Sequence, residues 1–310
     1  HHAGRAIIRF GGGVVTGGPM LVGCGTALAT PFTSTGAIDE RALRGFVDWQ
    51  LDEGIDFLVP CGSTGEAATM SLEEQQRVVE ITVEQARGRV PVVAGAGSND
   101  TKKAIALSLA MREAGATHLL HVAPAYSKPP QRGMVVHFRA IAEAVGLPIV
   151  LYNVPSRTGC NIDASTTLEL AQSDGFVGTK EASGNLHQIT DILVGRPQGF
   201  AVLSGDDEIT VPMLALGADG LVSVVSNVVP RLMRELVHRG RTGDASGARE
   251  LHERVLPWLR VAFVESNPIP VKAALSMMGR FENVLRSPLV TLDPRHEAAV
   301  RAALVAVGAL

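Results

Sequence analysis

Aromatic and sulfur-containing side chains are scarce in this chain of 310 residues, which holds only two tyrosines and two tryptophans. The three cysteines, Cys24, Cys61 and Cys160, are odd in number and widely spaced, so they indicate reduced thiols rather than a disulfide framework. Nothing in the pattern assigns a redox role to Cys61 or Cys160. We therefore expect a cytoplasmic protein with free thiols.

Long apolar runs and excess charge are also lacking. No run reaches the roughly 18–20 apolar residues that a membrane span needs. The net charge of −3 gives no basic surplus for nucleic acid or anionic lipid. The nine histidines are scattered, and the pair Asp206-Asp207 has no third ligand nearby, so we expect helix capping there and no metal site. Membranes, nucleic acids and metals are not expected partners.

Residues 1–20, HHAGRAIIRFGGGVVTGGPM, begin with two histidines and are interrupted by glycines. A signal peptide needs a continuous apolar stretch, which this segment lacks. We expect residues 1–20 to be disordered or added to the native sequence, and we leave open whether they are native.

Residues 21–243 have a regular rhythm in which short β-rich apolar runs alternate with amphipathic stretches about every 25–30 residues, typical of repeated βα units. The expected strands are Val22–Ala29, Phe57–Pro60, Val90–Ala94, His118–Ala123, Pro148–Tyr152, Phe176–Lys180, Phe200–Ser204 and Gly220–Val224. Eight units, with no glycine-rich nucleotide loop after the first strand, predict an α/β fold of the (β/α)8 TIM-barrel class rather than an open sheet.

Helix signals support this division and extend it beyond the barrel. Ser71 followed by Glu74 predicts a capping box at the start of a helix. Residues 244–310 carry no strand signal and predict a C-terminal helical extension with helices over 245–263 and 294–307. Between them, Asn267-Pro268-Ile269-Pro270 is expected to break the helix and form an extended turn.

The chemistry-bearing residues follow the expected strands, where a TIM barrel gathers its active site. Tyr126 and Tyr152 follow the fourth and fifth strands, and Lys180 ends the sixth. An amine beside phenol groups is what carbonyl chemistry through a Schiff base requires. Desolvation at the barrel mouth would favour the uncharged amine that can attack a carbonyl. Glu181 should point to the opposite face of the strand and play a structural role.

Two loops could bind an anionic substrate. The loop Cys61-Gly62-Ser63-Thr64-Gly65-Glu66 offers backbone N–H groups to a small carboxylate, although a glycine-rich turn that caps the next helix is an equal interpretation. Arg157, in a loop stiffened by Pro155, could hold a carboxylate with two hydrogen bonds. A plain surface arginine is the alternative there, and a half-buried amphipathic residue is the alternative for each tyrosine.

Taken together, these residues resemble the dihydrodipicolinate synthase family of pyruvate-dependent class I aldolases, a superfamily that also holds N-acetylneuraminate lyase. The resemblance runs from about residue 22 to the C-terminus. Its carriers are GSTGEAAT, AGAGSND, YNVPSRTGCNI, GTKEASGN, LSGDD and FVESNPIPVKAAL. The family implies a (β/α)8 barrel with C-terminal helices, assembled as a homo-oligomer, usually a dimer of dimers. It also implies a reaction that needs no metal or organic cofactor.

The resemblance implies roles for eight residues. The catalytic residues it implies are Lys180 (imine with pyruvate), Tyr152 (proton donor and acceptor), and Ser63 and Tyr126 (hydroxyl relay, with Tyr126 reaching in from a neighbouring subunit). The substrate-binding residues it implies are Thr64 (pyruvate carboxylate), Arg157 (carboxylate of L-aspartate 4-semialdehyde), Val222 and Gly205 (pocket lining). The implied reaction condenses pyruvate with that aldehyde to give 4-hydroxy-tetrahydrodipicolinate, the first committed step towards diaminopimelate and lysine.

Several positions depart from the family pattern. Ser63 replaces a more usual threonine and keeps the hydroxyl, and Ala125 replaces a tyrosine that packs across the family's dimer interface. The inhibitor pocket of lysine-sensitive members maps to Ala125, Leu72, Gln75 and Lys103, and only Asn99 is retained. Because a cation at Lys103 would repel the amino group of lysine, we expect weak or absent inhibition by L-lysine.

Two alternatives remain at this point. One is a sugar-acid aldolase or lyase of the same superfamily, acting on N-acetylneuraminate or 2-keto-3-deoxy-gluconate, for which a cationic clamp at Arg157 would be poorly matched. The other is a non-catalytic relative that serves as a scaffold. The sequence by itself also does not fix whether the assembly stops at a dimer or forms a tetramer.

Overall fold

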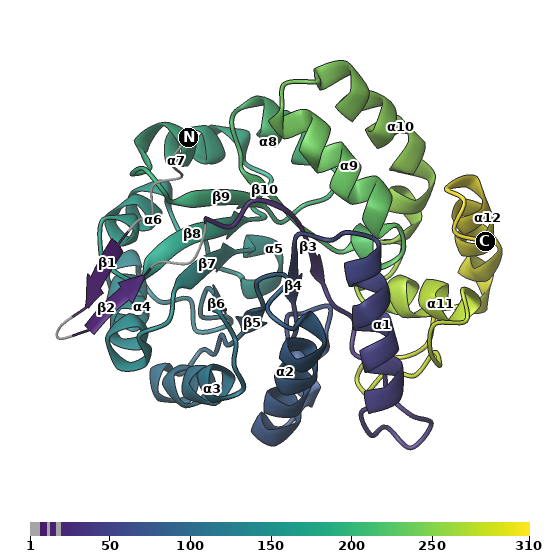
Figure 1. Cartoon of the computed structure of the whole chain (residues 1–310), viewed down its shortest axis with the longest axis horizontal. Helices are drawn as coiled ribbons and strands as arrows, with labels where there is room; N and C mark the ends of the chain where they lie inside the picture. Colours follow the sequence, from purple (N-terminus) through teal and green to yellow (C-terminus); the bar gives the residue numbers. More distant parts are fainter. Residues whose placement is uncertain (1–6, 11–12, 17–19) are drawn as a thin grey trace.

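The computed structural model describes residues 7–10, 13–16 and 20–310, with side chains from residue 20 onward. Within this part of the chain, eight parallel strands form a barrel with helices around it (Figure 1). The barrel strands are β3 (Gly23–Ala27), β4 (Phe57–Val59), β5 (Val93–Gly95), β6 (His118–Val122), β7 (Ile149–Asn153), β8 (Phe176–Glu181), β9 (Ala201–Ser204) and β10 (Gly220–Ser223). Each lies within or beside an expected strand, and the predicted fold class is confirmed.

The sheet runs in the order β4-β3-β10-β9-β8-β7-β6-β5, so the first and last strands of the repeat are neighbours. A parallel bridge between Leu58 and Val92 links β4 to the chain entering β5. Leu58 N donates to Pro91 O (3.0 Å) and Gly95 N donates to Pro60 O (2.9 Å), which brings the two edges together. The carboxyl ends of all eight strands therefore meet at one mouth.

Helices follow the strands and cover the outside of the barrel. Those of the barrel repeat are α1 (Glu40–Asp52), α2 (Leu72–Ala86), α3 (Thr101–Glu113), α4 (Gln131–Val145), α5 (Pro155–Thr158), α6 (Ala164–Ala171), α7 (Leu186–Gly195), α8 (Thr210–Ala215) and α9 (Pro230–Arg241), with 3-10 turns η1 (Ala67–Thr69) and η2 (Val225–Asn227). The predicted capping box at α2 is confirmed, because Glu74 N donates to Ser71 Oγ and Ser71 N donates to Glu74 Oε2. Among the described helices, none is both long and apolar enough to cross a membrane.

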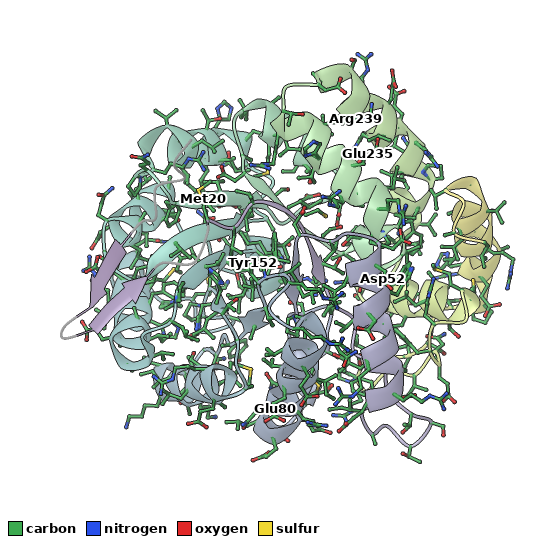
Figure 2. All side chains as sticks on the ribbon, viewed as in Figure 1. Met20, Asp52, Glu80, Tyr152, Glu235 and Arg239 are labelled. Atoms are coloured by element: carbon green, nitrogen blue, oxygen red, sulfur yellow. The ribbon has the colours of Figure 1, made fainter. Side chains whose placement is uncertain are left out.

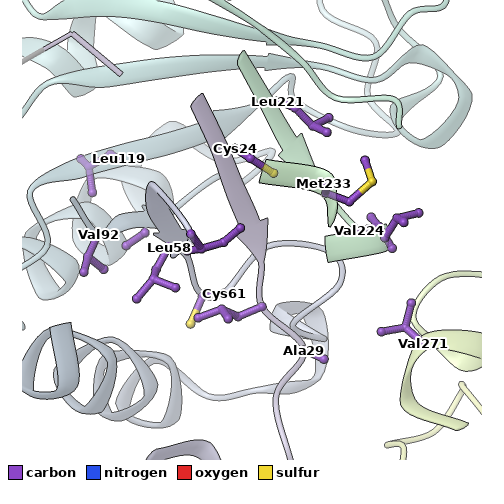
Figure 3. Packing of buried hydrophobic residues seen from close by; sticks show 14 of the residues in the cluster. Cys24, Ala29, Leu58, Cys61, Val92, Leu119, Leu221, Val224, Met233 and Val271 are labelled. Carbon is purple, nitrogen blue, oxygen red and sulfur yellow. The ribbon is translucent and has the colours of Figure 1, made fainter. Parts of the chain in front are cut away.

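Alternation along the strands divides the core into two layers. One set of strand side chains, including Cys24, Leu119 and Leu221, packs outward against the helices (Figure 3). The other set fills the barrel interior and contains Tyr152 and Leu203 among its aliphatic members. A residue's parity within its strand thus decides whether it faces the helices or the barrel axis.

The C-terminal segment is helical, as expected, and packs on one side of the barrel (Figure 1). It contains α10 (Ala245–Val261), α11 (Ile269–Met277) and α12 (Pro294–Ala306); α10 packs on α9 and α12, and α11 contacts η2. The expected extended turn at 267–270 is wrong in its second half. Pro270 lies in the first turn of α11, where the missing N–H would have no intrahelical partner and costs little.

The prediction for residues 1–20 lies mostly outside the described residues and stays a prediction. Within that segment, β1 (Ile7–Phe10) and β2 (Gly13–Thr16) form an antiparallel pair. The division at residues 243 and 244 likewise stays a prediction about domain boundaries.

Candidate active site

Lys180 and Tyr152 lie side by side inside the barrel because of strand register. Tyr152 on β7 is the direct partner of Lys180 on β8, and both belong to the inward-facing parity. The lysine side chain is 6% exposed, and its Nζ lies 4.0 Å from the centroid of the Tyr152 ring. Figure 2 labels Tyr152 near the centre of the barrel. The primary amine is therefore held over an aromatic face, away from bulk solvent.

The next residue along β8 faces the other way, as expected. Glu181 is fully buried, pairs in register with Asn153, and accepts hydrogen bonds from Asn153 Nδ2 (3.2 Å), Ser183 N (2.8 Å) and Gln188 Nε2 (3.1 Å). This outward network joins β7, β8 and α7. It fixes the strand ends that carry Tyr152 and Lys180 without entering the barrel.

The loop after β4 brings two hydroxyl groups to the barrel mouth. Ser63 is exposed and Thr64 is buried, and both line the same cavity as Lys180. The loop is tightly wound: Cys61 and Glu66 adopt left-handed φ angles of 58° and 56°, and Thr30 Oγ1 donates to Gly65 O at 2.7 Å. Non-glycine residues rarely adopt this conformation, so the surrounding contacts must hold the loop in place.

Arg157 stands on the opposite loop, after β7. The short helix α5 carries it, beginning at Pro155, and Arg157 N donates to Val154 O at 3.0 Å. The side chain is exposed and lines the cavity. A guanidinium on a stiff turn can bind a carboxylate with two parallel hydrogen bonds.

These groups surround a cavity of about 330 Å³ at the barrel mouth, which is large enough for a small substrate. Six of the eight predicted site residues line it: Lys180, Tyr152, Ser63, Thr64, Arg157 and Gly205. The structure does not bring the other two there. Val222 is buried in the interior cluster, while Val224 lines the cavity. Tyr126 is 90% exposed with a φ of 70° and does not line this cavity.

Several lining residues were not predicted. Asn267, Leu259 and Phe263 come from the C-terminal segment and close one side of the cavity. Asn267 lies in the motif FVESNPIPVKAAL, which carries the family resemblance, and in the expected helix break, but neither observation predicts a role for it in the site. Asp206 and Glu208 also line the cavity, and Asp206 Oδ1 accepts a hydrogen bond from Glu208 N at 2.9 Å.

The two residues of the acidic pair Asp206-Asp207 differ in their surroundings. Asp207 is buried and accepts hydrogen bonds from Ser223 Oγ and from Val224 N at 3.0 Å, next to η2. The helix that follows the pair, α8, has Ile209 as its N-cap, so neither carboxylate caps it. Burial raises the pKa of Asp207 to about 6, although these hydrogen bonds favour its ionised form. Among the described residues, no cluster of three or more histidine, cysteine or acidic side chains could hold a metal ion.

A second cavity of about 870 Å³ adjoins the first and shares Ser63, Tyr152 and Arg157 with it. The positions that depart from the family's inhibitor pocket meet here: Leu72, Gln75, Lys103 and Ala125 all line it. Asn99 is next to it, since its Nδ2 lies 3.4 Å from Ala125 O. Lys103 therefore lines the cavity to which the positions of the family's inhibitor pocket map.

Chemically, the first cavity combines a shielded primary amine, a phenol, two loop hydroxyls and a guanidinium. An amine can form an imine with a ketone, a phenol can move the proton, and the hydroxyls and guanidinium can bind carboxylates. The second cavity shares Tyr152, Ser63 and Arg157 with the first, but Lys180 lines only the first of the two.

Proteins of one known family resemble this chain along most of its length. A family model described as the dihydrodipicolinate synthetase family matches residues 20–307. A 4-hydroxy-tetrahydrodipicolinate synthase from Maridesulfovibrio salexigens is 51% identical over 287 residues, covering 92% of this chain and 98% of that protein. The crystal structure of dihydrodipicolinate synthase from Aquifex aeolicus has a TM-score of 0.90 and 41% identity, covering 92% of this chain and 97% of its own. The chloride-inhibited dihydrodipicolinate synthase from Acinetobacter baumannii, complexed with pyruvate, has a TM-score of 0.92 and 38% identity, covering 93% and 99%.

Proposed function

The chain belongs to the dihydrodipicolinate synthetase family, and we propose on that premise that it is a lyase that condenses pyruvate with L-aspartate 4-semialdehyde. The product is 4-hydroxy-tetrahydrodipicolinate, the first committed intermediate towards diaminopimelate and lysine. One observation carries the proposal: the Lys180 amine is 6% exposed inside the barrel and lies against the ring of Tyr152. The relatives reported above carry the synthase name, which favours this reaction over the sugar-acid lyase alternative.

The reaction proceeds through covalent catalysis. The Lys180 amine attacks the C2 carbonyl of pyruvate, and loss of water gives the imine. Loss of a C3 proton then gives an enamine, whose C3 attacks the aldehyde carbon. The amino group of the second substrate attacks C2 and displaces Lys180, so the ring closes and the lysine is regenerated. Tyr152, beside the amine, moves the protons, with Ser63 and a partner's Tyr126 completing the relay.

The charges around the cavity suit the second substrate. Thr64 and its loop bind the pyruvate carboxylate, and Arg157 binds the carboxylate of the aldehyde. Asp206 and Glu208 line the same cavity and offer negative charge to the ammonium group of that substrate. A polyhydroxylated sugar acid would instead need neutral hydrogen-bond partners at these positions. Gly205 gives the lysine room, and Val222 belongs to the same barrel-interior cluster as Tyr152.

Reductive trapping tests the covalent step directly. Incubation with pyruvate and borohydride should leave a reduced pyruvate adduct on Lys180, identified by peptide mass, and Lys180→Ala should abolish it. Turnover with L-aspartate 4-semialdehyde should far exceed turnover with N-acetylneuraminate. An unmodified lysine at saturating pyruvate would refute the proposal and favour a scaffold.

Arg157 provides a second, independent test. Arg157→Lys keeps the charge but loses the two-pronged geometry. A hydrogen bond to a charged group contributes about 1.5–3 kcal/mol, so KM for the aldehyde should rise about 10- to 100-fold. Pyruvate trapping at Lys180 should be unaffected. If trapping of pyruvate falls and KM for the aldehyde stays constant, Arg157 binds the carboxylate of pyruvate and not that of the aldehyde.

We further propose that the enzyme is a cytoplasmic homo-oligomer, a dimer of dimers. The 90% exposure of Tyr126 supports an assembly in which this phenol enters a neighbouring subunit's site. Mixing the impaired variants Tyr126→Phe and Lys180→Ala should restore activity, because a hybrid dimer contains one site with both groups intact. If activity does not recover although the subunits have exchanged, Tyr126 has no role in the partner's site. Analytical ultracentrifugation would distinguish a dimer from a tetramer.

A further inference from the structure

We infer that the C-terminal segment is part of the active site, because Asn267 and a buried Glu66–Lys272 ion pair position the loop that carries Ser63 and Thr64. The inference rests on the proposed pyruvate chemistry and adds three positioning residues to it. None of them touches the lysine nucleophile in the structure. Each acts through the loop after β4.

The contact closest to the chemistry joins Asn267 to Thr64. Asn267 Nδ2 donates to Thr64 Oγ1 at 2.8 Å, and both residues line the cavity. The amide N–H occupies a lone pair of the Thr64 hydroxyl oxygen, so the hydroxyl proton points away from Asn267. It is then free to donate to a substrate carboxylate in the cavity. The amide oxygen of Asn267 has no hydrogen-bond partner among the described residues. Its polar side chain is therefore anchored to Thr64 alone within this part of the chain.

A second contact holds the end of the same loop. Lys272 on α11 places its Nζ 2.6 Å from Glu66 Oε1, and both side chains are fully buried. Arg286 N donates to the other carboxylate oxygen at 3.0 Å, and the ring of Phe32 lies 4.2 Å from Lys272 Nζ. The Glu66 carboxylate is thus satisfied from two segments more than two hundred residues away in sequence.

These contacts coincide with the strained point of the loop. Glu66 has a φ of 56°, and Gly65, directly before it, packs so closely that an added Cβ would lie 3.0 Å from Leu28 O. A left-handed non-glycine residue persists only where its surroundings determine it. Releasing the carboxylate would let this turn relax, and the two hydroxyl-bearing residues before it would move with it.

The Glu66–Lys272 ion pair therefore does more than hold the C-terminal helices against the barrel. A buried ion pair is a poor source of stability, because desolvation of both charges offsets their attraction. These contacts instead fix the orientation of the Glu66 carboxylate. One of its oxygen atoms is bound by Lys272 and the other by the backbone N–H of Arg286. Leu259 and Phe263 of the same C-terminal segment also line the cavity, so the extension forms one wall of the site and sets the geometry of another.

The test is borohydride trapping of pyruvate, measured as the adduct on Lys180 against pyruvate concentration. The variants are Asn267→Ala, the double variant Glu66→Gln with Lys272→Met, and Lys272→Met alone. The double variant removes both charges at nearly constant volume, so it remains informative if the single lysine variant does not fold. A displacement of about 1 Å costs about 10²-fold in reactions that need alignment, so we expect the half-saturating pyruvate concentration to rise 10-fold or more. The plateau should stay near one adduct per chain, since Lys180 itself is unchanged.

Arg196→Met is the matched control. Arg196 forms a partly buried ion pair with Asp219 and lines neither cavity described above. It should lower thermal stability without changing the half-saturating concentration. If Asn267→Ala and the folded double variant trap pyruvate with the wild-type concentration dependence, the three residues are merely structural and the inference is overturned. If the wild-type protein forms no adduct, the proposed function fails first, and that outcome is distinct.

Discussion

Gly205 leaves space that the stem of Lys180 needs, which makes Gly205→Ala a sharp probe of the active site. A Cβ built on Gly205 would lie 2.9 Å from Lys180 Cε, 3.0 Å from Lys180 Cγ and 2.8 Å from the Cβ of Ala182. Gly205 is not in the left-handed region, so alanine introduces a contact without backbone strain. The substitution therefore acts on the nucleophile's position.

The size of the effect follows from the contact distances. Carbon atoms prefer separations of about 3.5–4.0 Å, so the lysine stem must move by about 0.6–1.1 Å. A displacement of about 1 Å at reacting atoms costs on the order of 10²-fold in rate. The accompanying overpacking should lower the free energy of unfolding by about 1–3 kcal/mol, so the fold survives while imine formation slows.

The assay compares rates of borohydride-trapped adduct formation and urea unfolding for the same protein. Gly45→Ala is the matched control, because Gly45 lies within α1 and an added Cβ there meets nothing within 4 Å. It should raise the free energy of unfolding by about 1 kcal/mol and leave trapping unchanged. A Gly205→Ala protein that traps pyruvate at the wild-type rate would show that Lys180 does not occupy this position during the reaction.

Further predictions concern pH and inhibition. Burial lowers the pKa of His118 to about 4 and of His121 to about 3. The unfolded chain takes up these protons first, so stability present above about pH 6.5 should fall on acidification, by about 2 kcal/mol per histidine at pH 5 in urea titrations. Asp207 acts in the opposite sense, because its folded pKa is raised to about 6; Asp207→Asn should therefore steepen the loss below pH 6, and an unchanged slope would contradict this. Because Lys103 lines the second cavity, L-lysine should inhibit weakly or not at all, and half-inhibition at sub-millimolar lysine would refute that expectation.

Local patterns were sufficient to predict the barrel. The spacing of β-rich runs predicted eight strands in the right places because a strand's apolar pattern depends on its immediate neighbours in sequence. The same parity argument put Lys180 and Glu181 on opposite faces, and register then made Tyr152 the neighbour of Lys180. The choice of Lys180 as the candidate nucleophile therefore used local information, a lysine at the end of an apolar strand, together with the family resemblance.

Contacts between distant segments could not be predicted in this way. The contact between Asn267 and Thr64 spans 203 positions and the pair Glu66–Lys272 spans 206. No periodicity encodes such pairings, because they arise only when the C-terminal helices pack beside the barrel. The start of α11 at the two prolines was missed for a related reason: local proline rules predict a break, and the tertiary position decides whether a helix begins there.

The sequence by itself therefore determined the βα repeat, the parity of its strands and the residue types at their ends, because each depends on neighbouring positions in the chain. Only the tertiary structure decided that Asn267 forms a wall of the cavity, that Val224 lines it instead of Val222, and that Tyr126 points into solvent. These outcomes depend on how close separate segments approach, and that distance is set by the packing of the whole barrel.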